Sequence, residues 1–173
     1  MREAHRCDAV ILGREAHFCF GREGSPDATL AHILRASPRP IVVVPRELPG
    51  GAGVVVAYGG CREAARSLQT FVLLGLADDE EVDVLAIHRD GAEAEAIVHV
   101  AGDFLGAHGT RHRLHPIASQ KSPAGVLLEE VRHRRPRLLV IGAHGHHSLR
   151  DLFVSSVTFG VLAECPVPVF VGA

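Results

Sequence analysis

The chain of 173 residues contains no tryptophan, one tyrosine, one methionine and four cysteines. The cysteines are scattered without a Cys-x-x-Cys pair, which argues against a disulfide framework and a zinc motif. Lys plus Arg number 18 and Asp plus Glu 20, and this balance argues against a dedicated nucleic-acid binder. No apolar run reaches the roughly 18 residues of a membrane span, and the charged start lacks the apolar core of a signal peptide. We therefore expect a reduced, cytoplasmic protein with no nucleic-acid or membrane partner.

Several enzyme signatures are also missing. The only lysine, Lys121, follows Gln120, so the chain has no Walker A loop. Neither a Gly-x-Gly-x-x-Gly fingerprint nor the His-Glu-x-x-His and Gly-x-Ser-x-Gly motifs occur. The sequence therefore predicts no catalytic residue and no metal-ligand set.

From residue 54 onward, short apolar runs alternate with segments of helical periodicity. The expected strands are Val54–Ala57, Val82–Ile87, Arg113–Ile117, Leu138–Ile141 and Val167–Val171. The expected helices are Arg62–Leu76, with Ala65, Leu68, Val72 and Gly75 on one face, Ala92–Ala107, Pro123–Arg134 and Phe153–Glu164. Strands separated by helices indicate a doubly wound α/β fold with a mainly parallel, five-stranded, Rossmann-like sheet.

The first 48 residues have two apolar runs, Ala9–Leu12 and Ile41–Val44, with a helix expected at Asp27–Arg35. Their order of strand, glycine, loop, helix, Pro-x-Pro and strand recurs at the end of the chain. Gly13 then matches Gly142, and Pro38 and Pro40 match Pro166 and Pro168. We expect a half-domain repeat at 1–48, a linker at 49–53 and a complete domain at 54–173. The alternative is a terminal addition of chance similarity.

A glycine-containing loop follows the strand Leu138–Ile141. It reads Ile141-Gly142-Ala143-His144-Gly145, then nine residues, then Ser155-Ser156-Val157-Thr158. Ligands bind open α/β sheets at the carboxyl ends of strands, and a helix start favours anions. A tight turn followed by an ordinary serine N-cap explains the same residues equally well.

This pattern resembles the universal stress protein family, whose ATP-binding members hold phosphates and ribose with Gly-x-x-Gly, nine residues and Gly-Ser/Thr. The resemblance spans Gly53–Ala173 and includes VVVAYGGCREAARSL, Pro123 and the closing CPVPVFV. The first 48 residues resemble the end of another copy, which implies a tandem-type member with a truncated first domain.

The resemblance assigns a nucleotide site, with ATP or AMP as ligand, with or without Mg²⁺. It places adenine at Ile87, which closes the second strand of the complete domain, and phosphates at the glycine loop. The implied nucleotide-binding residues are Ile87, Ile141, Gly142, Gly145, Ser155, Ser156 and Val157.

Two positions depart from the family pattern. Gly59 stands where the family has an acidic residue, and Ser155 replaces the last glycine of the signature. Each change removes or strains contacts worth roughly 0.5–1.5 kcal/mol per hydrogen bond. The N-terminal copy has Ala16 at its second loop glycine, so we expect no nucleotide there.

Other clusters have ordinary explanations beside their functional ones. His144, His146 and His147 could bind a metal ion, or could face solvent and donate to a phosphate. Cys61 is expected to be a turn residue rather than a reactive thiol.

We expect a stress-response protein that binds ATP or AMP as a regulatory ligand and is not an enzyme. Slow ATP hydrolysis is the less favoured option, because the family's acidic position is Gly59. The alternative is a dimeric interaction module without nucleotide. We expect a homodimer through the edge strands Ile41–Val44 and Val167–Val171, although Ile41–Val44 could instead take that role within one chain.

Overall fold

The computed structural model describes residues 2–15, 30, 32–34, 36–143 and 156–172. The strands are β1 (Val10–Gly13), β2 (Ile41–Val44), β3 (Val54–Ala57), β4 (Val82–His88), β5 (His112–Ala118), β6 (Leu138–Gly142) and β7 (Val169–Gly172). The helices are η1 (Arg2–Arg6), α2 (Arg62–Leu73), α3 (Gly91–Ala107), α4 (Pro123–Arg134) and α5 (Ser156–Glu164). Residues 30, 32–34 and 36 are helical, within and just after the expected helix Asp27–Arg35, most of which lies outside the described residues.

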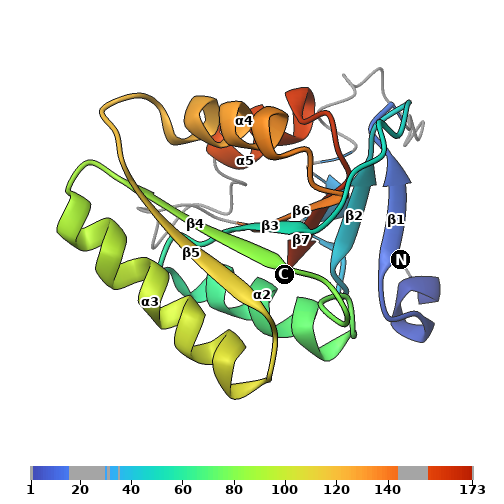
Figure 1. Cartoon of the computed structure of the whole chain (residues 1–173). Helices are drawn as coiled ribbons and strands as arrows, with labels where there is room; N and C mark the ends of the chain where they lie inside the picture. Colours follow the sequence, from blue (N-terminus) through green and yellow to red (C-terminus); the bar gives the residue numbers. More distant parts are fainter. Residues whose placement is uncertain (1, 16–29, 31, 35, 144–155, 173) are drawn as a thin grey trace.

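All seven strands form one sheet in the order β1-β2-β7-β6-β3-β4-β5. Every neighbouring pair is parallel except β2 and β7. Helices α2 and α3 lie on one face and α4 and α5 on the other (Figure 1). The doubly wound α/β class is therefore confirmed. The expected five-stranded sheet is present as β7-β6-β3-β4-β5, but β1 and β2 extend it to seven strands.

Two apolar clusters fill the space between the sheet and its helices. The strands alternate their side chains between these clusters, so Val54 and Val56 join one while Val55 joins the other. Phe71 and Phe170 meet edge to face with centroids 6.2 Å apart beneath α2. Strands buried on both faces explain the uninterrupted apolar runs of the sequence.

Helix α2 buries a face that only partly coincides with the expected one, since Leu68 is buried and Val72 packs against the core as expected. Its buried side chains are Ala64, Ser67, Leu68 and Phe71. Ala65 is exposed, and Gly75 lies beyond the helix with φ +68°. The apolar pattern misplaced the face because Ser67, a polar residue, is buried at 1% exposure.

Strands β2 and β7 pair with each other within the chain. Their antiparallel register joins Ile41 to Val171, Val42 to Phe170 and Val43 to Val169. The expectation that Ile41–Val44 and Val167–Val171 are edge strands is therefore wrong, because both lie inside the sheet, while the homodimer itself stays a prediction. The internal pairing that the sequence left open is what the structure has, and the edges of the sheet are β1 and β5.

The N-terminal strands are also tied to the last helix. The Arg14 guanidinium follows β1 and donates to the carbonyl oxygens of Ala163, at 3.1 Å, and Cys165 at the end of α5. A cation there satisfies carbonyl groups that the helix leaves free. Within the described part of the chain, no helix is both long and apolar enough to cross a membrane.

Candidate functional site

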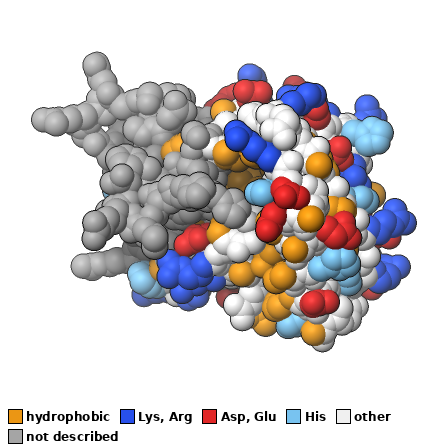
Figure 2. All heavy atoms as spheres, turned by 90° about the vertical axis from the view of Figure 1, so that its left-hand side faces the viewer, with side chains coloured by type: hydrophobic (Ala, Val, Ile, Leu, Met, Phe, Trp, Pro, Cys, Tyr) orange, Lys and Arg blue, Asp and Glu red, His pale blue; other side chains and the backbone are white. Residues whose placement is uncertain are grey.

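The candidate site lies at the carboxyl ends of β6, β3 and β4. These strands are neighbours and run parallel, so their ends meet at one edge of the sheet. The chain leaves β3 for α2 on one face and leaves β6 for α5 on the other, as Figure 1 shows. This divergence is the topological switch point at which open α/β sheets bind ligands. Figure 2 looks at this end, where hydrophobic atoms lie recessed among charged and histidine side chains beside the grey region.

The end of β4 offers main-chain groups to a ligand. The N–H groups of Val54 and Tyr58 donate to the carbonyl oxygens of Glu81 and Leu85 at 3.0 and 2.9 Å. Alternate residues of β4 therefore face β3, and Ile87 is the next in that series. Because β3 ends at Ala57, the N–H and C=O groups of Ile87 point past the end of β3.

The side chain of Ile87 adds an apolar surface to these groups. Ile87 is the register partner of Ile117 on β5. Both side chains are partly buried against the cluster below α4 and α5, as are Ala124 and Phe159 at the starts of those helices. A half-buried apolar surface beside main-chain groups that point past β3 suits a flat heterocycle such as a purine. Sequence reasoning found Ile87 but missed Ile117, whose strand has a weak pattern.

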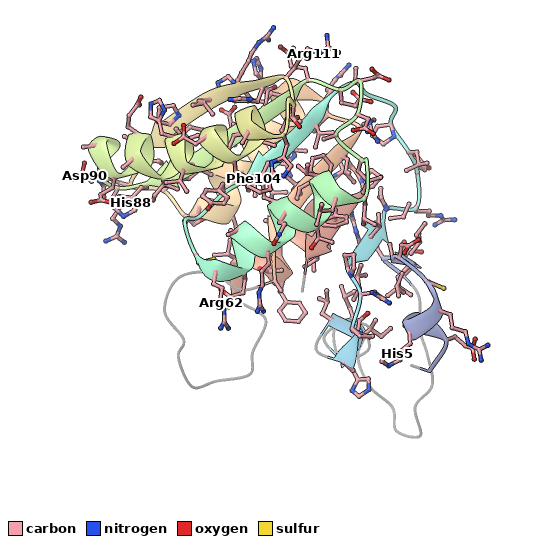
Figure 3. The ribbon with its side chains drawn as sticks, turned by 90° about the horizontal axis from the view of Figure 1, so that it is seen from below. His5, Arg62, His88, Asp90, Phe104 and Arg111 are labelled. Atoms are coloured by element: carbon pink, nitrogen blue, oxygen red, sulfur yellow. The ribbon has the colours of Figure 1, made fainter. Side chains whose placement is uncertain are left out.

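His88 and Asp90 lie together at the amino end of α3 (Figure 3). The Asp90 carboxylate accepts from the Ala92 N–H at 2.8 Å and caps α3, while the Asp90 N–H donates to His88 Nδ1 at 3.1 Å. These contacts give both residues a structural role. No group of three metal-ligating side chains occurs among the described residues, and His144, His146 and His147 lie outside them.

Gly142 has a packing role at the end of β6. A Cβ atom there would lie 2.8 Å from the Ala64 nitrogen, so α2 can approach only a glycine. Its register partner Gly172 is similar, because a Cβ there would lie 2.4 Å from the Ser67 Cα. The phosphate role that the resemblance implies for Gly142 stays a prediction, and the packing requirement explains the glycine by itself.

The helix that follows the loop is held against β6. Ser156 begins α5, and Val157 is half-buried in its first turn. The buried Thr158 places its hydroxyl 3.5 Å from the carbonyl oxygens of Gly142 and Ala143. The start of α5 therefore lies beside the end of β6, where the pattern predicts it. Gly145 and Ser155 lie outside the described residues.

The turn from β3 to α2 contains the first departure from the family pattern. Gly59 follows the buried Tyr58, and the sulfur of Cys61 accepts from the Ala64 N–H at 3.5 Å as the N-cap of α2. Cys61 is thus the turn residue that the sequence predicts. Burial raises the pKa of Tyr58, and the charge of Cys61 adds to this rise. A main-chain hydrogen bond at the helix start lowers the pKa of Glu63.

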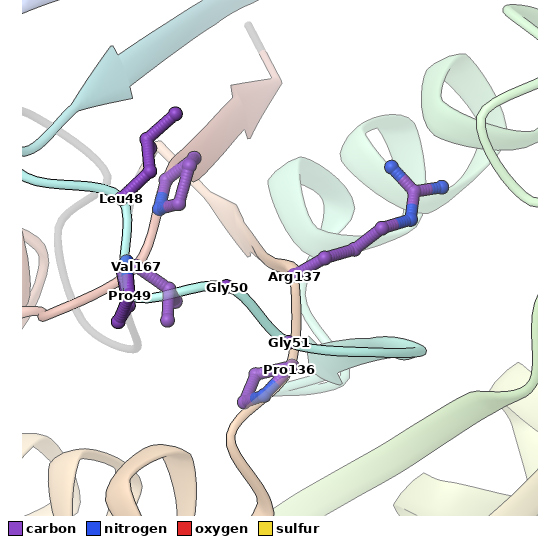
Figure 4. A pocket seen from close by; sticks show the side chains of 8 residues that line it. Leu48, Pro49, Gly50, Gly51, Pro136, Arg137 and Val167 are labelled. Carbon is purple, nitrogen blue, oxygen red and sulfur yellow. The ribbon is translucent and has the colours of Figure 1, made fainter.

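A separate apolar hollow lies at the opposite end of the sheet (Figure 4). Residues Leu48–Gly51 of the connector line it together with Pro136, Arg137, Val167 and Pro168. The Arg137 side chain points away from the hollow. Its Nε lies 2.5 Å from a carboxylate oxygen of Glu80, and its Nη2 donates to the Leu76 carbonyl at 3.0 Å.

Comparison with known proteins identifies the family. The model of the universal stress protein family matches residues 53–171, more than half of the chain. The chain belongs to the universal stress protein family. The matched region runs from β3 into β7 and includes the candidate site.

Individual relatives agree with this assignment. Universal stress protein Slr1230 of Synechocystis sp. is 26% identical over 164 residues, which cover 94% of this chain and 56% of that protein. A solved universal stress protein from Archaeoglobus fulgidus is 22% identical with a TM-score of 0.73, covering 99% of this chain and 62% of that one. The chain thus spans less than two thirds of the length of either relative.

A universal stress protein family member from Arabidopsis thaliana was solved with AMP bound. It is 16% identical with a TM-score of 0.55, covering 69% of this chain and 90% of that one. Further solved relatives, with TM-scores of 0.56 and 0.57, are complexes with dAMP and cAMP. At these identities the likeness concerns the fold.

Proposed function

We propose that this universal stress protein binds AMP or ATP at the carboxyl edge of β6, β3 and β4 as a regulatory ligand. The observation that carries the proposal is the end of β4, where Ile87 directs its main-chain groups past β3 beside a half-buried apolar surface. Adenine offers a donor and an acceptor on one edge, and it would pair with that N–H and C=O. The nucleotides held by solved relatives support this ligand class.

The remaining contacts follow from the family pattern. Ile141 leads into the loop, Gly142 and Gly145 would line the phosphates, and Ser155, Ser156 and Val157 would add donors at the start of α5. Mg²⁺ would have to rely on phosphates and water, since Gly59 provides no carboxylate. The same position leaves no general base for water attack, so we propose a binding protein rather than an enzyme.

The domain organisation is part of the proposal. Residues 1–48 would be the closing half of a first copy, 49–53 its connector and 54–173 the complete domain. Two parallel pairs of strands support this division, β1–β2 and β6–β7. The first strand of each pair ends at a matched glycine, Gly13 in β1 and Gly142 in β6. The N-terminal copy would hold no nucleotide, since Arg14 beyond its glycine is tied to α5.

A calorimetric titration with AMP and Mg-ATP tests the function, and restoring the family residue sharpens it. The backbone at Gly59 is outside the left-handed region, so Gly59→Asp introduces no strain in φ. The added carboxylate should tighten binding by about 2- to 10-fold, the value of one hydrogen bond. The control Gln120→Glu adds the same charge on an exposed neighbouring loop and should not tighten nucleotide binding. No binding below about 1 mM by either chain would contradict the proposal.

The alternative, a dimeric interaction module, is favoured by one observation on the sheet edges. The N–H groups of Val10 and Arg14 bond to the β2 side, so Ile11 and Gly13 direct their main-chain groups outward. Ile11 is 71% exposed. The other edge strand, β5, contains Pro116, which has no N–H to donate and so disfavours pairing with another chain. A second copy pairing through β1 would sediment as a dimer that Ile11→Lys dissociates. A monomer at about 10 µM would contradict this alternative.

A further inference from the structure

Strands β1 and β2 repeat the pairing of β6 and β7. Val10–Gly13 pair in parallel with Ile41–Val44, and Leu139–Gly142 pair in parallel with Val169–Gly172. The antiparallel contact between β2 and β7 relates the two pairs by an approximate two-fold axis. Each position of β1 and β2 therefore has an equivalent in β6 and β7, and the surroundings of the two can be compared.

In β6 and β7 the edge and one face are covered. Val140 lies beside β3 and is 1% exposed, and its β7 partner Phe170 is 0% exposed. Phe170 meets Phe71 of α2 edge to face. A Cβ at Gly142 would lie 2.8 Å from the Ala64 nitrogen in the same helix, so α2 approaches this glycine closely. A parallel strand and the helix that follows it thus cover this pair.

The equivalent positions of β1 and β2 are open. Ile11, the equivalent of Val140, is 71% exposed, and Val42, the equivalent of Phe170, is only half-buried. A Cβ at Gly13, the equivalent of Gly142, would meet no atom within 4 Å. Ile11, Gly13 and Val42 therefore form a surface, called here the β1 surface, where a strand and a helix stand in the other half of the sheet.

The β1 surface is suited to pairing with another strand. Strand β1 lies at the outer edge of the sheet, and Ile11 and Gly13 direct their main-chain N–H and C=O groups outward (Figure 1). Val10–Gly13 contains neither a charged residue nor a proline, the features that block pairing at an edge. The opposite face of β2 is already filled, because Ile41 and Val43 are buried in the cluster below α4 and α5.

We propose that the β1 surface binds a separate polypeptide that supplies a strand and a following amphipathic helix, in the manner of β3 and α2. The strand would run parallel to β1 and bond to its outward main-chain groups. The helix would bury Ile11 and Val42 and approach Gly13 with its first turn. Val44 stands where α2 meets Gly172, so the second turn of the partner's helix would lie farther from the sheet.

A second copy of this chain fits the β1 surface less well. Its own β3 and α2 are already built into its sheet. An antiparallel pair of two β1 strands would satisfy the main-chain groups but would leave the face at Ile11 and Val42 without a helix. The inference does not depend on the nucleotide, so the two proposals fail or succeed separately.

The test uses a peptide with the sequence of residues 53–76 and the substitution Cys61→Ser, which contains β3 and α2. Added to the full chain, it should slow amide exchange at Ile11 and Gly13 saturably, by about tenfold or more, because these amides become hydrogen-bonded. A peptide of residues 53–58, which has the strand without the helix, should protect the same amides more weakly. Exchange in β5, the other edge strand, should not change.

Two variants locate the contact. Ile11→Lys should abolish the protection, because it places a charge on the apolar surface. Gly13→Val should also abolish it, with little change in unfolding free energy, because the backbone at Gly13 is outside the left-handed region and its Cβ has space in the free chain. The matched control is Val100→Lys, which alters an apolar side chain of α3 that is 57% exposed and should leave the protection unchanged.

The outcomes decide between the occupants of the β1 surface. No protection by either peptide, or protection that persists in Ile11→Lys and Gly13→Val, would overturn the proposal. Equal protection by both peptides would overturn the part assigned to the helix. If the unaltered chain sediments as a dimer that Ile11→Lys dissociates, a second copy occupies the surface, and the proposal is overturned as well.

Discussion

The single tyrosine makes one residue of the site directly observable. Tyr58 is 5% exposed, and burial followed by the charge of Cys61 raises its pKa above the ordinary 10.0. Since the folded-state pKa is the higher one, this contribution to stability is complete below about pH 10 and is lost as pH rises through the folded pKa. The chain has no tryptophan, so absorbance at 295 nm reports Tyr58 alone.

We predict that the tyrosinate midpoint of the native protein lies above that of the protein in urea. The Tyr58→Phe variant should show a smaller loss of unfolding free energy between pH 8 and pH 11. Coincident midpoints in the two states would mean that Tyr58 is not buried as described.

Two matched glycines allow a second test at the residue scale. A Cβ at Gly142 would lie 2.8 Å from the Ala64 nitrogen, whereas a Cβ at Gly13 meets no atom within 4 Å. Gly142→Ala should therefore lower the unfolding free energy by about 1–3 kcal/mol, as overpacking does. Gly13→Ala should change it far less in the same urea titration. Equal effects would show that α2 does not approach β6 this closely.

At the residue scale, the sequence predicted part of the candidate site. Ile87 and Gly142 lie at the ends of clear apolar runs, and the family resemblance assigned them to one site, at the edge where their strands end. Ser67 was missed because a serine within an apolar helical pattern carries no signal of burial. Its hydrogen-bond partners, Ile141 and Gly172, are distant in the chain and meet it only through the tertiary fold.

At the scale of elements, local signals decided which boundaries were predictable. Helix α4 has the expected bounds, Pro123–Arg134, because Ser122 caps it, proline opens it and Arg135 ends it in the left-handed region. Helix α5 is described over Ser156–Glu164 and ends where the expected helix Phe153–Glu164 ends, while residues 144–155 lie outside the described structure. Periodicity alone identified this element and its end.

The cap of α3 provides a prediction for an element beside the site. Asp90→Ala removes the acceptor for the Ala92 N–H and should lower the unfolding free energy by about 1 kcal/mol. Asp90→Asn retains an acceptor and should cost less. Urea titrations of the two variants test this order, and a reversed order would contradict the capping role.

At the scale of the molecule, the sequence predicted the components better than their assembly. It predicted the strands and helices of the family-matched region, and its half repeat at 1–48 stays a prediction, but it placed Ile41–Val44 and Val167–Val171 at an interface between chains. Both strands are β-branched and apolar, and such a pattern indicates a partner without specifying which chain provides it. The structure assigns the partner to the same chain.

The attachment of the N-terminal strands is testable through Arg14. Arg14→Ala removes the guanidinium that bonds to the Ala163 and Cys165 carbonyl oxygens, interactions worth about 1.5–3 kcal/mol when one partner is charged. Amide exchange in β1 and β2 should become faster, with a smaller change in β4. Arg6→Ala, which removes a cation 80% exposed, should leave exchange unaltered. Unchanged exchange in Arg14→Ala would place the attachment elsewhere.

The central claim is that a nucleotide binds where β4 extends past β3. The most direct measurement is an AMP titration followed through the backbone amide resonances. We predict that the Ile87 amide shifts in a saturable manner together with residues at the start of α5, whereas the connector at Leu48–Gly51 does not. Saturable shifts confined to another region, or no shift at about 1 mM AMP, would contradict the account.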